Sequence, residues 1–203
     1  MYIEQIEILE KGRRKILFEN GMELLLYRGD VRENELKEGM DIPEELYEKL
    51  LYDLVGKRAK KRAMHLLEKQ DRTEYQLREK LRRHYPQEVV EDTIVYVKKY
   101  HYIDDLRYAC NYISCQKEKK SRRRLQQDLM KKGVDKRTIE EALETEGSGD
   151  EREAIRILLE KKGYHEDMER QEAHKLYQFL LRRGYQSSDI LYVMRSTIKD
   201  EID

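Results

Sequence analysis

Apolar and basic residues recur in the same order in three stretches of the chain, at residues 81–94, 129–143 and 180–194. Each stretch opens with an apolar residue and continues with a basic pair and an anchor residue, and further apolar residues stand one, six and ten positions beyond the anchor. The anchors are His84, Gly133 and Gly184. Their separations of 49 and 51 residues are typical of stacked helical repeats, in which each unit buries an apolar face against its neighbour. The pattern predicts an elongated surface suited to a large partner.

From Leu46 onward the spacing of apolar residues predicts helices, three in each repeat. In the first repeat we expect one helix through Ala63, a second capped by Asp71 or Thr73, and a third that starts at Pro86. The second and third repeats continue in the same order. The expected three-helix units are residues 51–100, 101–145 and 150–203, joined by a flexible linker at residues 145–150.

The first 50 residues follow a different pattern and predict a small antiparallel β-sheet. Short β-prone runs occupy residues 3–9, 14–18 and 22–27. Between the last two runs, Asn20-Gly21 predicts a two-residue hairpin turn, because both residue types tolerate positive φ. A helix should open at Pro43. So small a sheet is marginally stable alone and should pack against the helices that follow. The expected fold class is mainly α, with a β-rich extension at residues 1–50.

Composition agrees with thin layers of amphipathic helix. The chain has 203 residues, of which 41% are charged and 38% hydrophobic, with no Trp and two Pro. No apolar run approaches the roughly 20 residues that span a bilayer, and the first residues lack the pattern of a secretion signal. Cys110 and Cys115 would point in different directions from one helix, so a disulfide between them is not expected. We expect a cytoplasmic protein.

The formal net charge of zero hides a strong division along the chain. Residues 1–56 carry 8 Lys and Arg against 14 Asp and Glu, residues 57–137 carry 24 against 12, and residues 138–203 carry 10 against 16. The middle block therefore has a net charge of +12 between two blocks of −6. A polarised charge distribution of this kind affects the choice of partner more than the fold.

The basic residues of the middle block are the candidate contacts for an acidic protein surface or a phosphate backbone. They cluster in two runs, 57–62 and 117–124, and in the pairs Arg82-Arg83 and Lys131-Lys132, which we expect at equivalent places in two repeats. The alternative is that these charges only solvate helix faces. The candidate contact residues are Lys57, Arg58, Lys61, Arg62, Arg82, Arg83, Lys117, Lys119, Lys120, Arg122, Arg123, Arg124, Lys131 and Lys132.

Residues with recognisable catalytic or metal-binding spacing are missing from the sequence. Asp104-Asp105 is better explained as a cap and first turn of a helix than as a pair of metal ligands. The five histidines are scattered, neither cysteine pairs with a histidine at zinc-type spacing, and the glycines form no phosphate-binding loop. We therefore expect no enzyme activity, no metal and no cofactor.

Tyrosine is the main aromatic residue, with 15 tyrosines against two phenylalanines. Five tyrosines stand among basic residues of the middle block, and two explanations remain open for them. They could stack on the bases of a single nucleic acid strand, or they could pack at the edges of thin helical layers, with the ring buried and the hydroxyl in water. These residues are Tyr96, Tyr100, Tyr102, Tyr108 and Tyr112.

Two segments of the middle block, 102–109 and 121–134, resemble the central signature of the bacterial RecX family, and the segment 72–81 resembles its first-repeat helix. The similarity extends over roughly residues 57–195. Two departures from the family pattern stand out. Ser121 occupies a position where many members have Gly, and the first repeat is one residue short between Leu81 and His84.

This resemblance implies three tandem three-helix repeats without enzyme activity. It also implies a regulatory protein that binds the filament of the RecA recombinase on DNA. Such a protein would inhibit or modulate ATP hydrolysis, strand exchange and filament extension, in DNA repair and SOS control. Two other hypotheses remain: a protein that binds DNA directly through a basic repeat surface, and a scaffold for an unrelated acidic partner. Without a coiled-coil seam, we expect a monomer.

Overall fold

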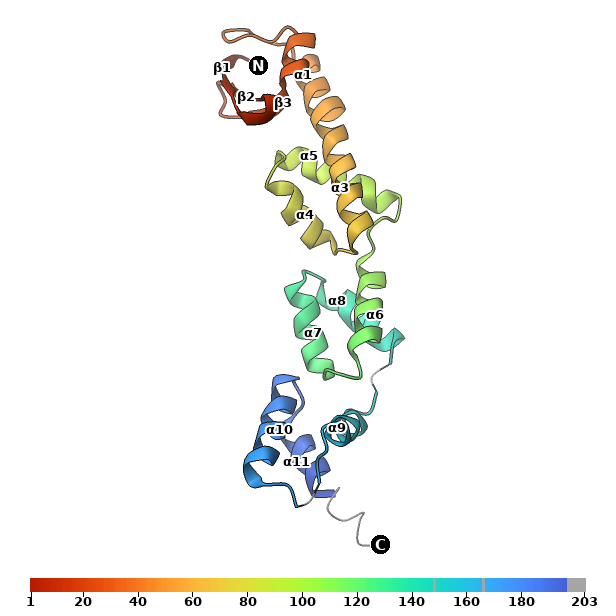
Figure 1. Cartoon of the computed structure of the whole chain (residues 1–203). Helices are drawn as coiled ribbons and strands as arrows, with labels where there is room; N and C mark the ends of the chain where they lie inside the picture. The colour runs from red at the N-terminus through yellow and green to blue at the C-terminus, as the bar shows by residue number, and fades with distance from the viewer. Residues whose placement is uncertain (148, 166, 197–203) are drawn as a thin grey trace. The chain divides into compact units, whose positions relative to one another are not determined.

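Strands come first along the chain and helices follow, as the apolar pattern predicts (Figure 1). The computed structural model describes residues 1–147, 149–165 and 167–196. These residues fall into two compact units, one from Met1 to Asp104 and one from Asp105 onward. The first unit contains a three-stranded sheet and three-helix repeat 1, and the second contains repeats 2 and 3.

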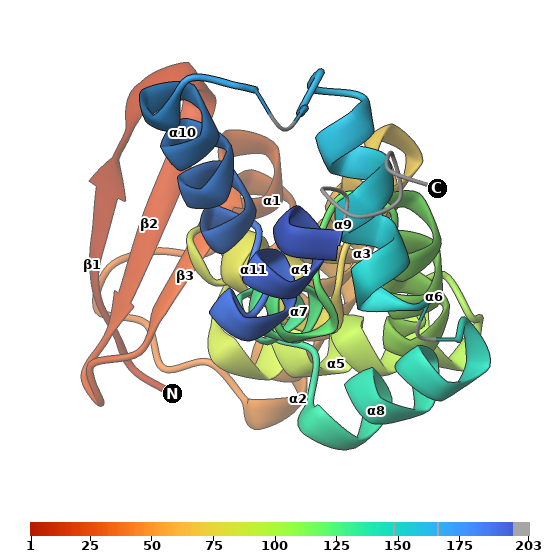
Figure 2. The ribbon, with the colours of Figure 1, turned by 90° about the horizontal axis from the view of Figure 1, so that it is seen from below.

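The N-terminal strands form an antiparallel sheet in the order β1-β2-β3 and lie side by side in Figure 2. They are β1 (Ile3–Ile8), β2 (Arg13–Phe18) and β3 (Glu23–Tyr27), with the short helix η1 (Glu10–Gly12) between the first two. Facing pairs such as Ile6 with Ile16 and Ile16 with Leu24 place apolar side chains together. The predicted small antiparallel sheet is confirmed.

The predicted two-residue turn between β2 and β3 is wrong. The Phe18 amide donates to the Met22 carbonyl over 3.0 Å and the Gly21 amide donates to the Phe18 carbonyl over 2.8 Å, so the loop has three residues. Only Gly21 has a positive φ, of 78°. The Asn20 side chain instead accepts a hydrogen bond from the Met22 amide at 3.0 Å. Asn20 therefore acts as a turn residue through its side chain, without left-handed backbone.

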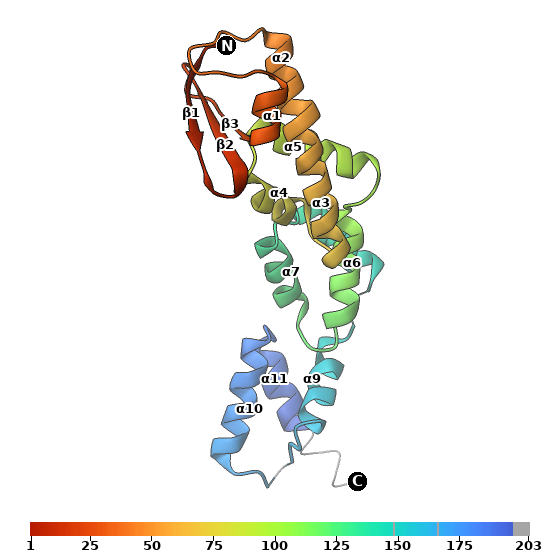
Figure 3. The same ribbon diagram turned by 45° about the horizontal axis from the view of Figure 1, so that its top comes forward.

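Helices of the first unit include one long continuous segment, which Figure 3 shows as α2 running into α3. Between these two helices the backbone takes a wider, π-helical turn. The sequence pattern predicts the opening of α2 after Pro43, but neither this π-helical segment nor α1. The helices are α1 (Arg28–Glu33), α2 (Glu44–Glu48), η2 (Lys49–Gly56), α3 (Lys57–Lys69), α4 (Glu74–Arg82) and α5 (Gln87–Lys99).

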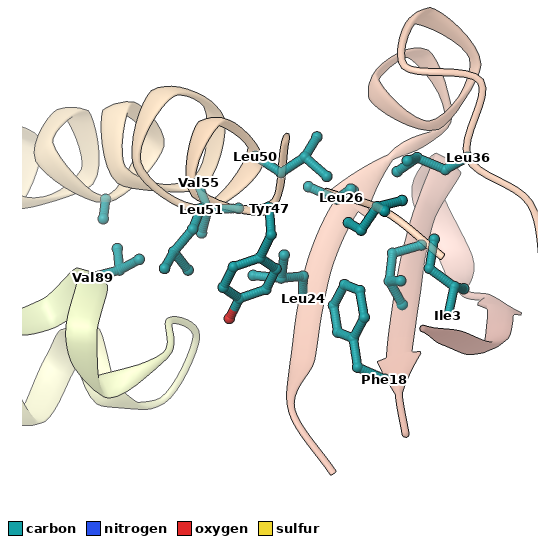
Figure 4. Close-up of a cluster of buried hydrophobic side chains, with 13 residues drawn as sticks. Ile3, Phe18, Leu24, Leu26, Leu36, Tyr47, Leu50, Leu51, Val55 and Val89 are labelled. Atoms are coloured by element: carbon teal, nitrogen blue, oxygen red, sulfur yellow. The ribbon is translucent and has the colours of Figure 1, made fainter. Parts of the chain in front are cut away.

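The sheet packs against the helices, as so small a sheet requires. Figure 4 shows Phe18 and Leu24 of the sheet facing Tyr47 and Leu51, with Val89 of α5 at the edge of the same cluster. The rings of Phe18 and Tyr47 meet edge to face, with centroids 5.4 Å apart. Because Val89 is fully buried here, the sheet shares its core with a helix of repeat 1.

Repeat 1 has its own core between α3, α4 and α5. Ala63, Leu77 and Leu81 are completely buried there. Of the two candidate caps for α4, Thr73 is the one used. Its hydroxyl accepts from the Gln76 amide at 3.2 Å, and the Gln76 side chain accepts from the Thr73 amide at 3.3 Å. This reciprocal capping box fixes where α4 begins.

The second unit consists of two three-helix repeats, each with a separate apolar core. Repeat 2 contains α6 (Asp105–Gln116), α7 (Arg122–Lys131) and α8 (Lys136–Thr145). Repeat 3 contains α9 (Glu151–Glu160), α10 (Arg170–Arg182) and α11 (Ser187–Ser196). Ser121, Asp135 and Asp150 cap α7, α8 and α9 through their side chains. The predicted linker at 145–150 includes Ser148, which lies outside the described residues.

The middle helices of the repeats do not end alike. In repeats 2 and 3, Gly133 and Gly184 have φ of 84° and 91°. The Val134 amide donates to the Leu129 carbonyl, and the Tyr185 amide donates to the Leu180 carbonyl, in each case five residues back. In repeat 1 the Tyr85 amide reaches Leu81 after only four residues. The structure therefore confirms the prediction that the first repeat is one residue shorter at this turn.

The expected equivalence of Arg82-Arg83 and Lys131-Lys132 holds at the helix ends, where Arg82 and Lys131 are the last helical residues and Arg83 and Lys132 are the C-caps. Their register against the core differs by one residue. Counted from the buried leucine, the arginines stand at the first and second positions and the lysines at the second and third. One residue corresponds to about 100° around a helix. Relative to the buried leucine, the two basic pairs therefore differ in direction by about 100°.

Candidate partner interface

The basic run on α3 divides into structural and exposed residues. Arg58 donates to Asp30 over 2.7 Å, and its guanidinium carbon lies 4.6 Å from the centre of the Tyr27 ring. Burial alone would raise the pKa of Asp30, but hydrogen bonds from Arg58 and from the Tyr27 amide outweigh it and lower that pKa. Arg58 thus joins α3 to α1. Lys61 and Arg62 are exposed and have no ion pair within the described residues.

The other candidates of the first unit are also divided. Lys57 is exposed, with its amine 3.7 Å from Asp53. Arg82 lies 3.2 Å from Glu79 and 3.8 Å from Glu91. Arg83 is exposed and has no ion pair in the described part of the chain. Exposed pairs such as those of Lys57 and Arg82 are weak, so a strongly acidic partner could displace them.

In repeat 2, Lys120 lies in a half-buried polar cluster between α6 and α7. Its amine is 2.8 Å from Asp128 and 2.7 Å from the Tyr112 hydroxyl, and Arg124 approaches the same carboxylate at 3.2 Å. Burial alone would raise the pKa of Asp128, but hydrogen bonds from Lys120 and Tyr112 outweigh it and lower that pKa. Burial alone would lower the pKa of Lys120, but its hydrogen bonds with Asp128 and Tyr112 outweigh burial and raise that pKa. Lys120 therefore holds the repeat together.

The remaining candidates of repeat 2 differ in the contacts that they make. Lys117 donates to the Glu146 carbonyl over 2.9 Å. The Lys132 amine lies 5.3 Å from the centre of the Tyr112 ring and 6.0 Å from that of Tyr108, so it packs over aromatic faces. A third group forms no ion pair among the residues that the structure describes: Lys119, Arg122, Arg123 and Lys131.

Backbone contacts join the start of α7 to the end of α10. The Ser121 amide donates to the Arg183 carbonyl over 3.1 Å, and the Arg183 guanidinium donates to the Lys119 carbonyl. Gly184 lies against the first turn of α7, where a β-carbon on this glycine would stand 2.6 Å from the Ser121 hydroxyl oxygen. The Arg122 amide donates to Glu151 over 2.8 Å. Repeats 2 and 3 therefore share a close junction.

Two open depressions adjoin this junction and share Arg124 and Arg182. The first also contains Arg123, Gln127 and Ser187. The second also contains Lys119, Lys120, Arg183 and Phe179, and the Arg183 guanidinium lies 4.4 Å from the centre of the Phe179 ring. The result is a positively charged surface that extends from one repeat to the next. We name it the α7–α10 basic surface and define it as Lys119, Arg123, Arg124, Arg182 and Arg183.

Arg182 and Arg183 are absent from the residues predicted as contacts. They stand in an acidic block, which hides them from a count of charge along the chain. The sequence signal that could have identified them as contacts is their position within the repeat. Measured from the buried leucine of each repeat, Arg182-Arg183 occupies the same positions as Lys131-Lys132.

Among the described residues, no group of three His, Cys, Asp or Glu side chains is close enough to hold a metal ion. No helix in that part of the chain combines the length and apolar character needed to cross a membrane. Both cysteines are free, as expected. The three-helix repeats, each with its own apolar core, define a tandem three-helix-repeat protein.

Comparison with known proteins identifies the family. Models described as the first, second and third three-helix domains of RecX match residues 59–96, 104–143 and 150–194. The chain belongs to the RecX family.

Individual relatives agree. The chain is 30% identical over 175 residues to "Regulatory protein RecX" of Clostridium botulinum (strain Eklund 17B / Type B), covering 82% of each chain. It is 32% identical over 158 residues to the protein of that name from Caldanaerobacter subterraneus subsp. tengcongensis, covering 76% of this chain and 78% of the relative. A crystal structure of regulatory protein RecX matches 95% of this chain and 98% of its own, with a TM-score of 0.60 and 25% identity.

Proposed function

We propose that this protein binds the RecA recombinase filament on DNA and inhibits or modulates its activity without catalysing a reaction itself. The affected processes would be ATP hydrolysis, strand exchange and filament extension, in DNA repair and SOS control. Membership of a family whose relatives are named regulatory proteins supports the proposal. The protein would act in the cytoplasm as a monomer.

The α7–α10 basic surface is the observation that carries this proposal. Arg123 and Arg182 are exposed there and have no ion pair among the described residues. The backbone bonds of Ser121 and Arg183 hold the two helix ends together, so the backbone that carries these arginines needs little ordering on binding. Arginine suits both carboxylates and phosphates, because its planar group can donate two parallel hydrogen bonds. The surface therefore fits an acidic protein face next to DNA.

The predicted contact residues would divide into two roles. Direct contacts would come from the residues without ion pairs, which are the exposed Lys61, Arg62, Arg83, Lys119, Arg123 and Lys131 and the half-buried Arg122. The others, especially Arg58 and Lys120, would act mainly by stabilising the repeats. Charge reversal in the second group would also destabilise the fold, so a loss of partner binding could not be assigned to a lost contact.

The test is the ATPase rate of a RecA filament on single-stranded DNA as the protein is titrated in. The Arg123→Glu, Arg182→Glu double variant should raise the concentration for half-inhibition at least about tenfold, which corresponds to losing ~1.4 kcal/mol of binding free energy. Arg137→Glu on α8 is the control, because Arg137 is also exposed and lies outside the basic surface. Equal effects of the two variants would refute a role for this surface.

Binding to bare DNA, measured in the same buffer, separates the remaining hypotheses. Inhibition well below the concentrations that bind bare DNA supports a regulator that recognises the filament. Inhibition that only follows DNA binding, with a steep dependence on salt, favours a DNA-binding protein that competes for the strand. No effect in either assay leaves a scaffold for another acidic partner.

A further inference from the structure

Three tyrosines at the C-terminal end of α5 form a contiguous aromatic surface, which we name the tyrosine ladder: Tyr96, Tyr100 and Tyr102. The ring centroids of Tyr96 and Tyr100 are 4.9 Å apart, and those of Tyr100 and Tyr102 are 6.1 Å apart. Tyr96 packs partly against the core of repeat 1. Tyr100 is 54% exposed and Tyr102 is 43% exposed, so much of the ladder faces solvent.

The backbone between the outer two rings has an unusual conformation. His101 has a φ of 55°, and the Tyr102 amide donates to the Val97 carbonyl over 2.9 Å. Turns with the same five-residue hydrogen bond follow α7, α9 and α10, and there the chain uses glycine, which adopts this conformation without strain. Here an exposed histidine adopts it instead, next to the two exposed rings. Strained backbone that the fold maintains is a recurrent feature of functional sites.

Positive charge lies beside the ladder. The Lys99 amine is 5.9 Å from the centre of the Tyr100 ring, and Lys99 has no ion pair within the described residues. The Lys60 amine is 5.1 Å from the centre of the Tyr96 ring and 2.8 Å from Asp92. Exposed aromatic faces flanked by cations are the usual elements of a surface that binds single strands, because bases stack on the rings and the cations neutralise phosphates.

The other two tyrosines singled out in the sequence do not share these properties. Tyr108 and Tyr112 are half-buried, and both rings lie under Lys132. The Tyr112 hydroxyl also donates to Asp128 over 3.0 Å. For this pair, edge packing accounts for the aromatic side chains. Of the two explanations left open by the sequence, stacking therefore concerns only the tyrosine ladder.

We propose that the tyrosine ladder binds single-stranded nucleic acid by stacking on its bases, with Lys99 facing a phosphate. This inference goes beyond the proposed function, since it requires no recombinase. A protein partner fits the surface less well. The amines of Lys60 and Lys99 lie beside the Tyr96 and Tyr100 rings, whereas an apolar contact needs a continuous apolar patch.

The experiment compares two oligonucleotides of equal length, one normal and one in which the central bases are replaced by abasic sites. Abasic sites keep the phosphates and remove the stacking partners. The variants are the Tyr100→Ala, Tyr102→Ala pair and, as a control, Tyr52→Ala, because Tyr52 is similarly exposed at 42% and lies outside the ladder. Affinity is measured by fluorescence anisotropy with the full chain at low salt, and circular dichroism verifies folding.

We expect the double variant to bind the normal strand about 10- to 100-fold more weakly than the wild type, and the abasic strand equally well. Tyr52→Ala should bind both strands like the wild type, and Tyr100→Phe, which keeps the ring, should bind almost normally. Equal weakening on both strands would overturn the proposal, and so would unchanged binding to the normal strand or no binding by the wild type. A double variant that loses recombinase inhibition with normal DNA binding would instead assign the ladder to a protein contact. If the double variant is misfolded, Tyr100→Leu replaces it.

Discussion

Replacing Gly184 by alanine should destabilise the second unit more than the same change at Gly163. Both glycines have positive φ, of 91° and 69°, so alanine has an unfavourable backbone conformation at either position. At Gly163 no other atom lies within 4 Å of the added β-carbon. At Gly184 the β-carbon would stand 2.6 Å from the Ser121 hydroxyl oxygen and 2.7 Å from the Arg124 β-carbon.

The size of each effect follows from these contacts. The backbone conformation alone costs about 1–2 kcal/mol for alanine, which is the loss expected for Gly163→Ala. Gly184→Ala adds the displacement of α7 from the turn after α10, and forced contacts of this kind cost about 1–3 kcal/mol more. We therefore expect a total loss of ~2–5 kcal/mol for Gly184→Ala.

Equilibrium unfolding in urea, followed by circular dichroism, measures both losses. The transition should be analysed for two units, because the first unit does not contain either glycine. Adding Ser121→Gly to Gly184→Ala should restore part of the stability, since it removes one of the two close contacts and glycine is an acceptable cap. Equal losses for the two alanine variants, or no partial recovery, would refute the described packing of the junction.

Two further predictions concern a helix cap and a half-buried carboxylate. Thr73→Ala should cost about 1 kcal/mol of unfolding free energy, because it removes the cap of α4; Asp71→Ala, at the exposed candidate two residues earlier, should change little in the same urea titration. Asp128 has a folded-state pKa below its ordinary value of 3.8, so its stabilisation is complete above that pH and is lost as the pH falls through the lower value. The stability difference between wild type and Asp128→Asn should accordingly shrink below about pH 4. A difference that stays constant down to pH 2 would contradict the ion pair with Lys120.

The sequence predicted those parts of the fold that repeat or that use strong local signals. Helices with regular apolar spacing and a cap such as Ser121 or Asp135 could be located, because periodicity and capping are local. Helix α1 could not be, since its six residues are mostly polar and only Asp30 is buried. The π-helical turn at 49–56 shares its core with the sheet, which is distant in sequence, so no local pattern predicts it.

The candidate interface was harder to predict than the fold, because charge along the chain does not reveal pairing in space. Arg58 and its partner Asp30 are 28 residues apart, so a run of basic residues concealed one with a structural role. Arg182 illustrates the opposite error. It lies in an acidic block, yet the fold places it beside Arg123 and Arg124.

The division of the apolar interior into separate cores has a consequence for how such a chain evolves. Repeats 2 and 3 bury their own side chains, with Leu129 in one core and Leu180 in the other. Substitutions in separate cores have nearly independent effects, so a change in one repeat needs no compensating change in the next. Each repeat can accumulate substitutions at its own rate. The junction residues, such as Gly184, are constrained by both neighbours and should be the slowest to change.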